Sequence, residues 1–149
     1  MKTEVSRSIT IPSDRELMDL LGEKIYEYYN VLCKTIVFSF DPDKEVWDSG
    51  SRRGKYFHGY YVYKKFIQVH MFLNSEYLMC HFLLRKIHRE KIRKKIEIFS
   101  KKTQKRFEEE GIWADFLILN ENDEDFEDAI KVIEILSSTR KRKEMRQPT

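Results

Sequence analysis

Three runs of β-branched and aromatic residues, close together in the middle of the chain, constrain the fold most. They occupy residues 55–63, 66–73 and 77–84, within the stretch GKYFHGYYVYKKFIQVHMFLNSEYLMCHFLLR. Their lengths and composition are typical of β-strands, because branched and aromatic side chains suit a pleated, half-buried surface. Only residues 64–65 and 74–76 separate the runs, which predicts two short hairpin turns. The sequence therefore predicts a three-stranded antiparallel meander.

Successive side chains of a strand point to opposite faces, so two-residue turns at 64–65 and at 74–75 or 75–76 divide the meander into two sets. One set is close to uniformly apolar in the second and third strands, and we assign it to the core: Tyr56, His58, Tyr60, Val62, Ile67, Val69, Met71, Leu73, Leu78, Cys80, Phe82 and Leu84. The other set is aromatic but interleaved with Gln and His, as on a partly exposed face: Phe57, Gly59, Tyr61, Tyr63, Phe66, Gln68, His70, Phe72, Tyr77, Met79, His81 and Leu83.

The chain has 149 residues, of which 41% are hydrophobic and 36% are charged. This hydrophobic fraction excludes a disordered chain, and the length suits one domain with one core. We predict a single α+β domain over residues 13–138, with an antiparallel sheet (the three-strand meander plus edge strands) packed against helices. An N-terminal arm over 1–12, extended or forming a short edge strand, precedes it. A basic, disordered tail over 139–149 follows it.

Composition also bears on the compartment. The apolar runs are far shorter than the roughly 18 residues that cross a bilayer, and the opening MKTEVSRSIT lacks the apolar segment of a signal peptide. Cys33 and Cys80 have no metal or redox spacing, which predicts buried free thiols. We therefore expect a cytoplasmic protein without membrane contact.

Helical signals precede the meander. Ser13 and Glu16 have the Ser-x-x-Glu form of a capping box, and Gly22 marks a break after the short helix that follows. Apolar residues then recur at three- and four-residue intervals over 23–38, which predicts an amphipathic helix lying across the apolar face of the sheet.

Further elements follow the meander. The spacing of apolar residues over 87–107 predicts one basic helix, or two short helices joined near Ser100, and Gly111 should end it. A strand over 112–119 and a closing helix over 123–138 complete the predicted order. Acidic residues begin that last helix, where the helix dipole favours them.

Several short motifs lie at particular points of this order: Pro12-Ser13-Asp14-Arg15-Glu16-Leu17, Leu21-Gly22-Glu23, Glu45-Val46-Trp47, Gly54-Lys55-Tyr56 and Asp123-Glu124-Asp125. With the basic helix after the meander, they give residues 11–143 a pattern that resembles a mostly bacterial family catalogued as domain of unknown function number 3788. The resemblance implies an α+β domain with an antiparallel sheet packed against helices. The family has no established activity, so the resemblance implies no catalytic residue.

The aromatic set of the meander is the main candidate site. Ligand pockets and protein interfaces share its mixture of rings and hydrogen-bonding groups, which favours a small ligand or a protein partner. The candidate ligand-binding residues are Tyr61, Tyr63, Gln68, His70, Tyr77 and His81. Two alternatives remain: Trp47, Trp113 or Phe116 covers this face as a second core layer, or a homodimer forms on it.

The basic segment is the alternative site. Residues 85–106 hold eleven Lys or Arg against two Glu, and such a segment can neutralise nucleic-acid phosphates. The candidate contacts are Lys86, Arg89, Arg93, Lys94, Lys101, Lys102, Lys105 and Arg106. However, residues 107–128 carry ten acidic residues and no Lys or Arg. If this acidic segment packs against the basic helix, it cancels the positive field.

Catalytic and metal-binding motifs are missing from the sequence. His70 and His81 share a face of neighbouring strands, but no third ligand is evident, so we expect neither a metal nor a cofactor. We favour a non-catalytic binding module, with nucleic-acid binding through 85–106 as the alternative and an enzyme of unknown class as the third.

Overall fold

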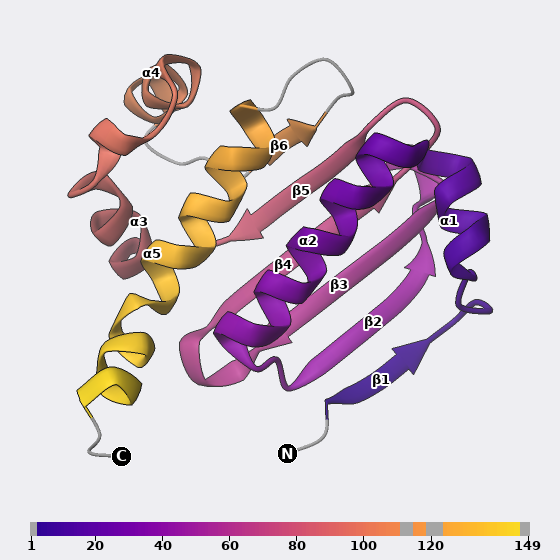
Figure 1. The fold of residues 1–149 in the computed structure, drawn as a ribbon, viewed down its shortest axis with the longest axis horizontal. Coiled ribbons are helices and arrows are strands. Elements are labelled where there is room, and N and C mark those ends of the chain that lie inside the picture. The colour runs from indigo at the N-terminus through magenta and orange to yellow at the C-terminus, as the bar shows by residue number, and fades with distance from the viewer. Residues whose placement is uncertain (1–2, 111–114, 119–123, 147–149) are drawn as a thin grey trace.

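The structure, a computed structural model, describes residues 3–110, 115–118 and 124–146. Within these residues six strands form one sheet, side by side in the order of the sequence (Figure 1). They are β1 (Glu4–Arg7), β2 (Lys44–Ser49), β3 (Tyr56–Val62), β4 (Ile67–Leu73), β5 (Leu78–Leu83) and β6 (Asp115–Ile118). The four neighbouring pairs from β2 to β6 are antiparallel, and β1 is parallel to β2. The predicted α+β fold, with a sheet packed against helices, is confirmed.

The register of the central strands separates the two predicted faces. Val62 pairs with Ile67, and Leu73 pairs with Leu78. On β4 the burial alternates along the strand, with Ile67, Val69, Met71 and Leu73 buried and the residues between them only half-buried. The predicted division of the meander into an apolar face and a mixed aromatic face is therefore confirmed.

The first hairpin turn is longer than the sequence predicts. Tyr63–Lys65 form a short 3-10 helix, η2, and Phe66 adopts a left-handed backbone with φ 56°. The Lys64-Lys65 pair gives no sign of this turn, because Phe rarely takes a conformation that crowds its Cβ. Strands β3 and β4 each lose one residue to the turn, so the pairing of the two strands and the face of each side chain remain as predicted. The second turn centres on Ser75 and Glu76, the later of the two predicted positions.

Two helices connect the parallel strands β1 and β2, because parallel neighbours need a crossover. Helix α1 (Asp14–Leu21) begins with the predicted capping box: Ser13 Oγ accepts from the Glu16 N–H at 3.1 Å, and Glu16 Oε1 accepts from the Ser13 N–H at 3.2 Å. Gly22, with φ 82°, ends α1 and separates it from α2 (Glu23–Phe40). Figure 1 shows α2 crossing the middle of the sheet.

The basic segment folds as two helices, α3 (Lys86–Arg93) and α4 (Lys101–Glu110), joined through the 3-10 helix η3 (Ile96–Ile98) and Ser100. This agrees with the second of the two predicted arrangements. Strand β6 occupies part of the predicted strand at 112–119. Gly111 and the rest of that strand lie outside the described residues.

Helix α5 (Glu124–Arg146) lies beside α2 on the same face of the sheet (Figure 1). Acidic residues fill its first turn, as predicted. The helix continues to Arg146, eight residues beyond the predicted end of the closing helix at Ser138. The physical reason is composition: Arg, Lys, Glu and Met favour helices, and the first proline after this helix is Pro148.

The hydrophobic core lies between the helices and the apolar face of the sheet. Leu32 and Ile36 of α2, and Val132 and Ile133 of α5, are fully buried, as is Phe82 of β5. Each such side chain contributes about 1.5–3 kcal/mol through removal from water. No helix among the described residues is long and apolar enough to cross a membrane.

Candidate functional site

The mixed face of the sheet lies opposite α2 and α5. We call it the open aromatic face and define it by seven side chains: Phe57, Tyr61, Gln68, His70, Phe72, Met79 and His81. Each remains only half-buried, so the described part of the chain does not cover this face. Trp47 and Phe116 do not cover it, because Trp47 stacks on the buried His58 and Phe116 packs edge-on to Phe82, both on the helix side. Trp113 lies outside the described residues.

Two histidines, His70 and His81, lie at the centre of the open aromatic face. His70 pairs with His81 across β4 and β5, their ring centroids 6.1 Å apart, and His81 pairs with Asp115 of β6. Nδ1 of His81 hydrogen bonds to Oδ1 of Asp115, and Nε2 of His70 donates to Oε1 of Gln68 at 3.1 Å. Burial, followed by the nearby His81 and Arg53, lowers the pKa of His70 to about 4. His70 is therefore neutral near pH 7 and serves as a hydrogen-bonding ring.

Aromatic rings surround His70. The Phe57 ring meets it edge-on with centroids 5.0 Å apart, and the Tyr61 ring lies 5.8 Å away. Gly59 makes this arrangement possible, since a Cβ there would lie 2.8 Å from the Phe57 ring. Edge-on and tilted contacts of this kind leave ring faces available for a further ring to stack on.

Each end of the open aromatic face has a shallow pocket next to an arginine. One, of about 280 Å³, is formed by residues 49–53 with Phe57 and Phe72, and the Arg53 guanidinium lies 5.1 Å from the Phe72 ring centroid. The other, of about 250 Å³, is bordered by η2, by residues of β3 and β4, and by Arg85, whose guanidinium lies 4.1 Å from the Phe66 ring centroid. Both pockets thus combine rings with a cation.

Four of the six predicted ligand-binding residues belong to the open aromatic face, and the other two, Tyr63 and Tyr77, lie beside it. The six are not gathered in one pocket. Tyr61, Tyr63 and Gln68 all border the pocket beside Arg85. His70 and His81 lie in the middle. Tyr77 lies toward the other end, where its hydroxyl donates to the Arg53 carbonyl at 3.3 Å. Within the described residues, no group of three or more His, Cys, Asp or Glu could hold a metal ion.

The predicted nucleic-acid residues divide between α3 and α4. Lys86, Arg93, Lys94, Lys101 and Lys105 are exposed. Lys102 is exposed too, but it pairs with Asp125 of the acidic segment at 3.1 Å, and this ion pair is of the kind that the predicted masking requires. Arg89 and Arg106 donate instead to backbone carbonyls, those of Leu84 and Asp115.

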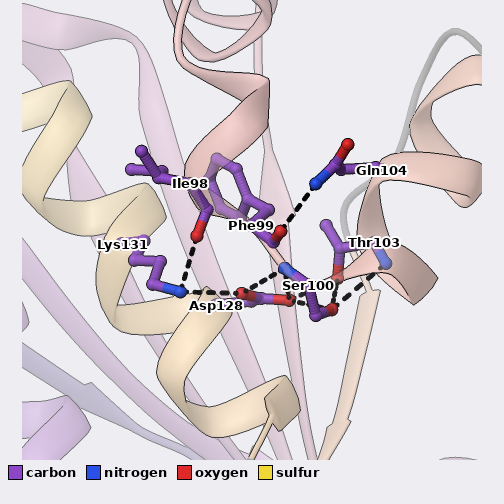
Figure 2. A network of polar contacts seen from close by, with 7 residues as sticks. All are labelled: Ile98, Phe99, Ser100, Thr103, Gln104, Asp128 and Lys131. Atoms are coloured by element: carbon purple, nitrogen blue, oxygen red, sulfur yellow. Dashed lines mark hydrogen bonds and ion pairs between the residues drawn. The ribbon is translucent and has the colours of Figure 1, made fainter.

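A buried carboxylate fixes the start of α4 to α5 (Figure 2). Asp128 is 1% exposed and accepts from the Ser100 and Thr103 hydroxyls, both at 2.6 Å, and from the Ser100 N–H. Lys131 Nζ lies 3.5 Å from its other oxygen and also donates to the Ile98 carbonyl at 2.8 Å. A negative charge at a helix N-terminus is stabilised by the helix dipole. Asp128 is thus engaged in holding α4 and does not neutralise the exposed lysines.

A second polar cluster lies beneath α2, and no sequence motif indicates it. The buried His58 accepts from the Tyr29 hydroxyl at 2.7 Å through Nδ1, and its Nε2 lies 2.5 Å from Glu45 Oε2. A carboxylate only accepts, so Nε2 carries the proton. The hydrogen bond from His58 lowers the pKa of Glu45, against a smaller opposing effect of burial. Nothing in the sequence links these three residues, since they come from three separate elements.

Comparisons of this chain with protein-family models, with curated proteins and with solved structures found no match. The resemblance to domain of unknown function number 3788 therefore stays a prediction.

Proposed function

We propose that this chain is a binding module that holds a planar, ring-containing ligand on the open aromatic face. The observation that supports this most is a set of accessible rings on the two central strands, Phe57 and Tyr61 on β3 and Phe72 on β4. Aromatic side chains at such positions would ordinarily be buried by a second layer, which the described residues do not supply.

The chemistry of the face narrows the ligand class. Stacking on a ring contributes about 1–3 kcal/mol per aromatic contact, and it needs only a flat π-system. Gln68 and the neutral His70 offer hydrogen bonds to polar edges of such a ring. Arg53 and Arg85, at the two ends, suit an anionic substituent. A nucleobase with an attached phosphate has all three properties, either as a free nucleotide or within a single strand.

Titrations with adenosine monophosphate and with a fluorescently labelled single-stranded oligonucleotide test this proposal. We expect Tyr61→Ala and His70→Ala to weaken binding of one probe by about tenfold, as loss of a stacking contact implies. Phe38→Ala is the matched control, since Phe38 is 74% exposed on α2, on the opposite side of the sheet, and should bind as wild type does. Circular dichroism confirms that each variant is folded. Wild-type binding by both face variants would place the ligand elsewhere.

Nucleic-acid binding through α3 and α4 is a second candidate function. It is favoured by the exposed basic residues, because in the described part of the chain no ion pair joins Lys86, Lys94 or Lys101 to a carboxylate. Phosphate contacts release counterions, so this binding must fall steeply with salt, whereas stacking on the open aromatic face responds little. Lys94→Ala with Lys101→Ala should then weaken oligonucleotide binding at low salt, and Tyr61→Ala should leave it unchanged.

A further inference from the structure

A third pocket, on the helix side of the sheet, lies between α2 and β3. It has a volume of about 390 Å³ and is bordered by Cys33, Lys34, Val37, Phe38 and Tyr60. Val37 and Phe38 are 47% and 74% exposed, so the outer wall is apolar and open to solvent. Tyr60 and Tyr61 point to opposite faces of β3, which makes this pocket independent of the open aromatic face and of the function proposed for it.

The base of this pocket adjoins the polar cluster beneath α2. Cys33 is one helical turn after Tyr29, and its Sγ lies 3.9 Å from the same His58 nitrogen that accepts from the Tyr29 hydroxyl. Glu45 accepts from the other ring nitrogen at 2.5 Å. The Cys33 thiol and the Glu45 carboxylate thus lie at the two ring nitrogens of His58. Sites in which a base activates a nucleophile, and a third group orients the base, have the same arrangement.

We propose that Cys33 is a modification site, whose thiol adds to a small, apolar α,β-unsaturated carbonyl compound held in this pocket, with His58 as the proton acceptor. In this step the Cys33 sulfur forms a bond to the β-carbon, and the π electrons of the carbon–carbon double bond move toward the carbonyl. The thiol proton passes to the Tyr29 hydroxyl oxygen, while the hydroxyl's own proton passes to Nδ1 of His58, to which it already donates. That proton then returns by the same route and is delivered to the α-carbon, so the product is a neutral thioether. No oxidant or reductant is needed.

The surroundings of Cys33 explain why a base is required. Burial is the main cause that raises the pKa of the Cys33 thiol to about 12, against hydrogen bonds between Cys33 and the Tyr29 and Tyr60 hydroxyls, which lower it. Thiolate is therefore scarce at pH 7, and the proton must leave during the attack. Burial also raises the pKa of Tyr29 and of Tyr60, so both stay neutral. His58 is the neutral base within reach, since burial lowers its pKa despite Glu45.

Labelling of the folded, full-length protein with cyclohexenone, followed by intact mass and peptide mapping, tests this proposal. We expect a single adduct at Cys33 and none at Cys80, which is fully buried and serves as an internal control. Between about pH 7 and pH 9 the rate should stay nearly constant, because His58 is already unprotonated there. A free thiol without a base would instead react about tenfold faster with each pH unit.

Two variants show whether His58 acts as a base or has only a structural role. His58→Gln should lose the flat pH profile, and Glu45→Gln, which keeps the imidazole, should slow labelling by about a hundredfold. If His58→Gln does not fold, the wild-type profile and Glu45→Gln still decide the matter. A wild-type rate that climbs tenfold per pH unit would overturn the proposal. So would equal labelling of Cys33 and Cys80, or a Glu45→Gln rate that equals the wild-type rate.

Discussion

His70 shows, at the scale of single residues, how the open aromatic face affects a titrating group. Its pKa lies at about 4 in the folded protein and at the ordinary 6.5 when the chain is unfolded. Below pH 6.5 the unfolded state binds a proton that the folded state does not bind. The free energy of unfolding therefore falls as the pH decreases from 6.5 toward about 4, and it is highest above 6.5 with respect to this group.

Replacing His70 with glutamine removes this titration and keeps a polar side chain beside Gln68. We expect His70→Gln to lose less stability than wild type between pH 6.5 and about pH 4, as measured by urea denaturation at several pH values in this range. Phe38→Ala, on the other side of the sheet, is the control, since it removes no titrating group and should keep the wild-type slope. Equal slopes for His70→Gln and wild type would show that His70 titrates normally in the folded protein.

At the scale of secondary-structure elements, Asp128 joins two helices, because this side chain of α5 binds the first turn of α4. Asp128→Asn puts an N–H group among donors and removes the charge that faces the helix N-terminus. We expect a loss of about 3 kcal/mol in the free energy of unfolding, since hydrogen bonds to a buried charge are strong. Hydrogen exchange at residues 101–104 should also become faster. Glu127→Gln, on the exposed side of α5, is the control and should change stability by less than about 0.5 kcal/mol.

The elements differ in how well the sequence predicts them. Strands β4 and β5 were predictable because buried and more exposed residues alternate along them. Strand β3 was predictable because it is rich in aromatic residues, and α1 because a capping box depends only on neighbours. The parallel pairing of Glu4–Arg7 with β2 was not, because the partner lies some forty positions away and β1 is too short to show a pattern. The cluster of Tyr29, Glu45 and His58 could not be predicted for the same reason, because these three residues come close together only when α2 packs on the sheet.

The sequence predicts which residues form the open aromatic face, but it does not predict the pockets at the ends of that face. Alternation places His70 and His81 together, and the structure does bring them side by side. Nothing local indicates that Phe66 turns through a left-handed conformation, which brings it and Tyr63 to a pocket with Arg85. Long-range packing of this kind depends on residues outside the strand, so a strand pattern does not reveal it.

At the scale of the whole molecule, the sheet is covered on one side only. Helices α2 and α5 lie on the apolar side of the sheet (Figure 1). On the other side, the side chains that the structure describes are only half-buried. The two sides also differ in chemistry: the helix side has a pocket over a nucleophile and a base, and the open side has accessible rings between two arginines. Rings retained on a half-exposed face contribute less to stability than the same rings in a core, which is what a binding surface requires.

This one-sided arrangement predicts unequal costs for two phenylalanines on neighbouring strands. Phe82 of β5 is fully buried against Phe116, so Phe82→Ala should lower the free energy of unfolding by about 3–5 kcal/mol. Phe72 of β4 contacts the Phe57 ring and the Arg53 guanidinium on the open side, and Phe72→Ala should cost only about 1–2 kcal/mol. Urea denaturation of both variants measures the difference. Equal losses would mean that another layer covers the open aromatic face, and that its rings belong to a second core rather than to a binding surface.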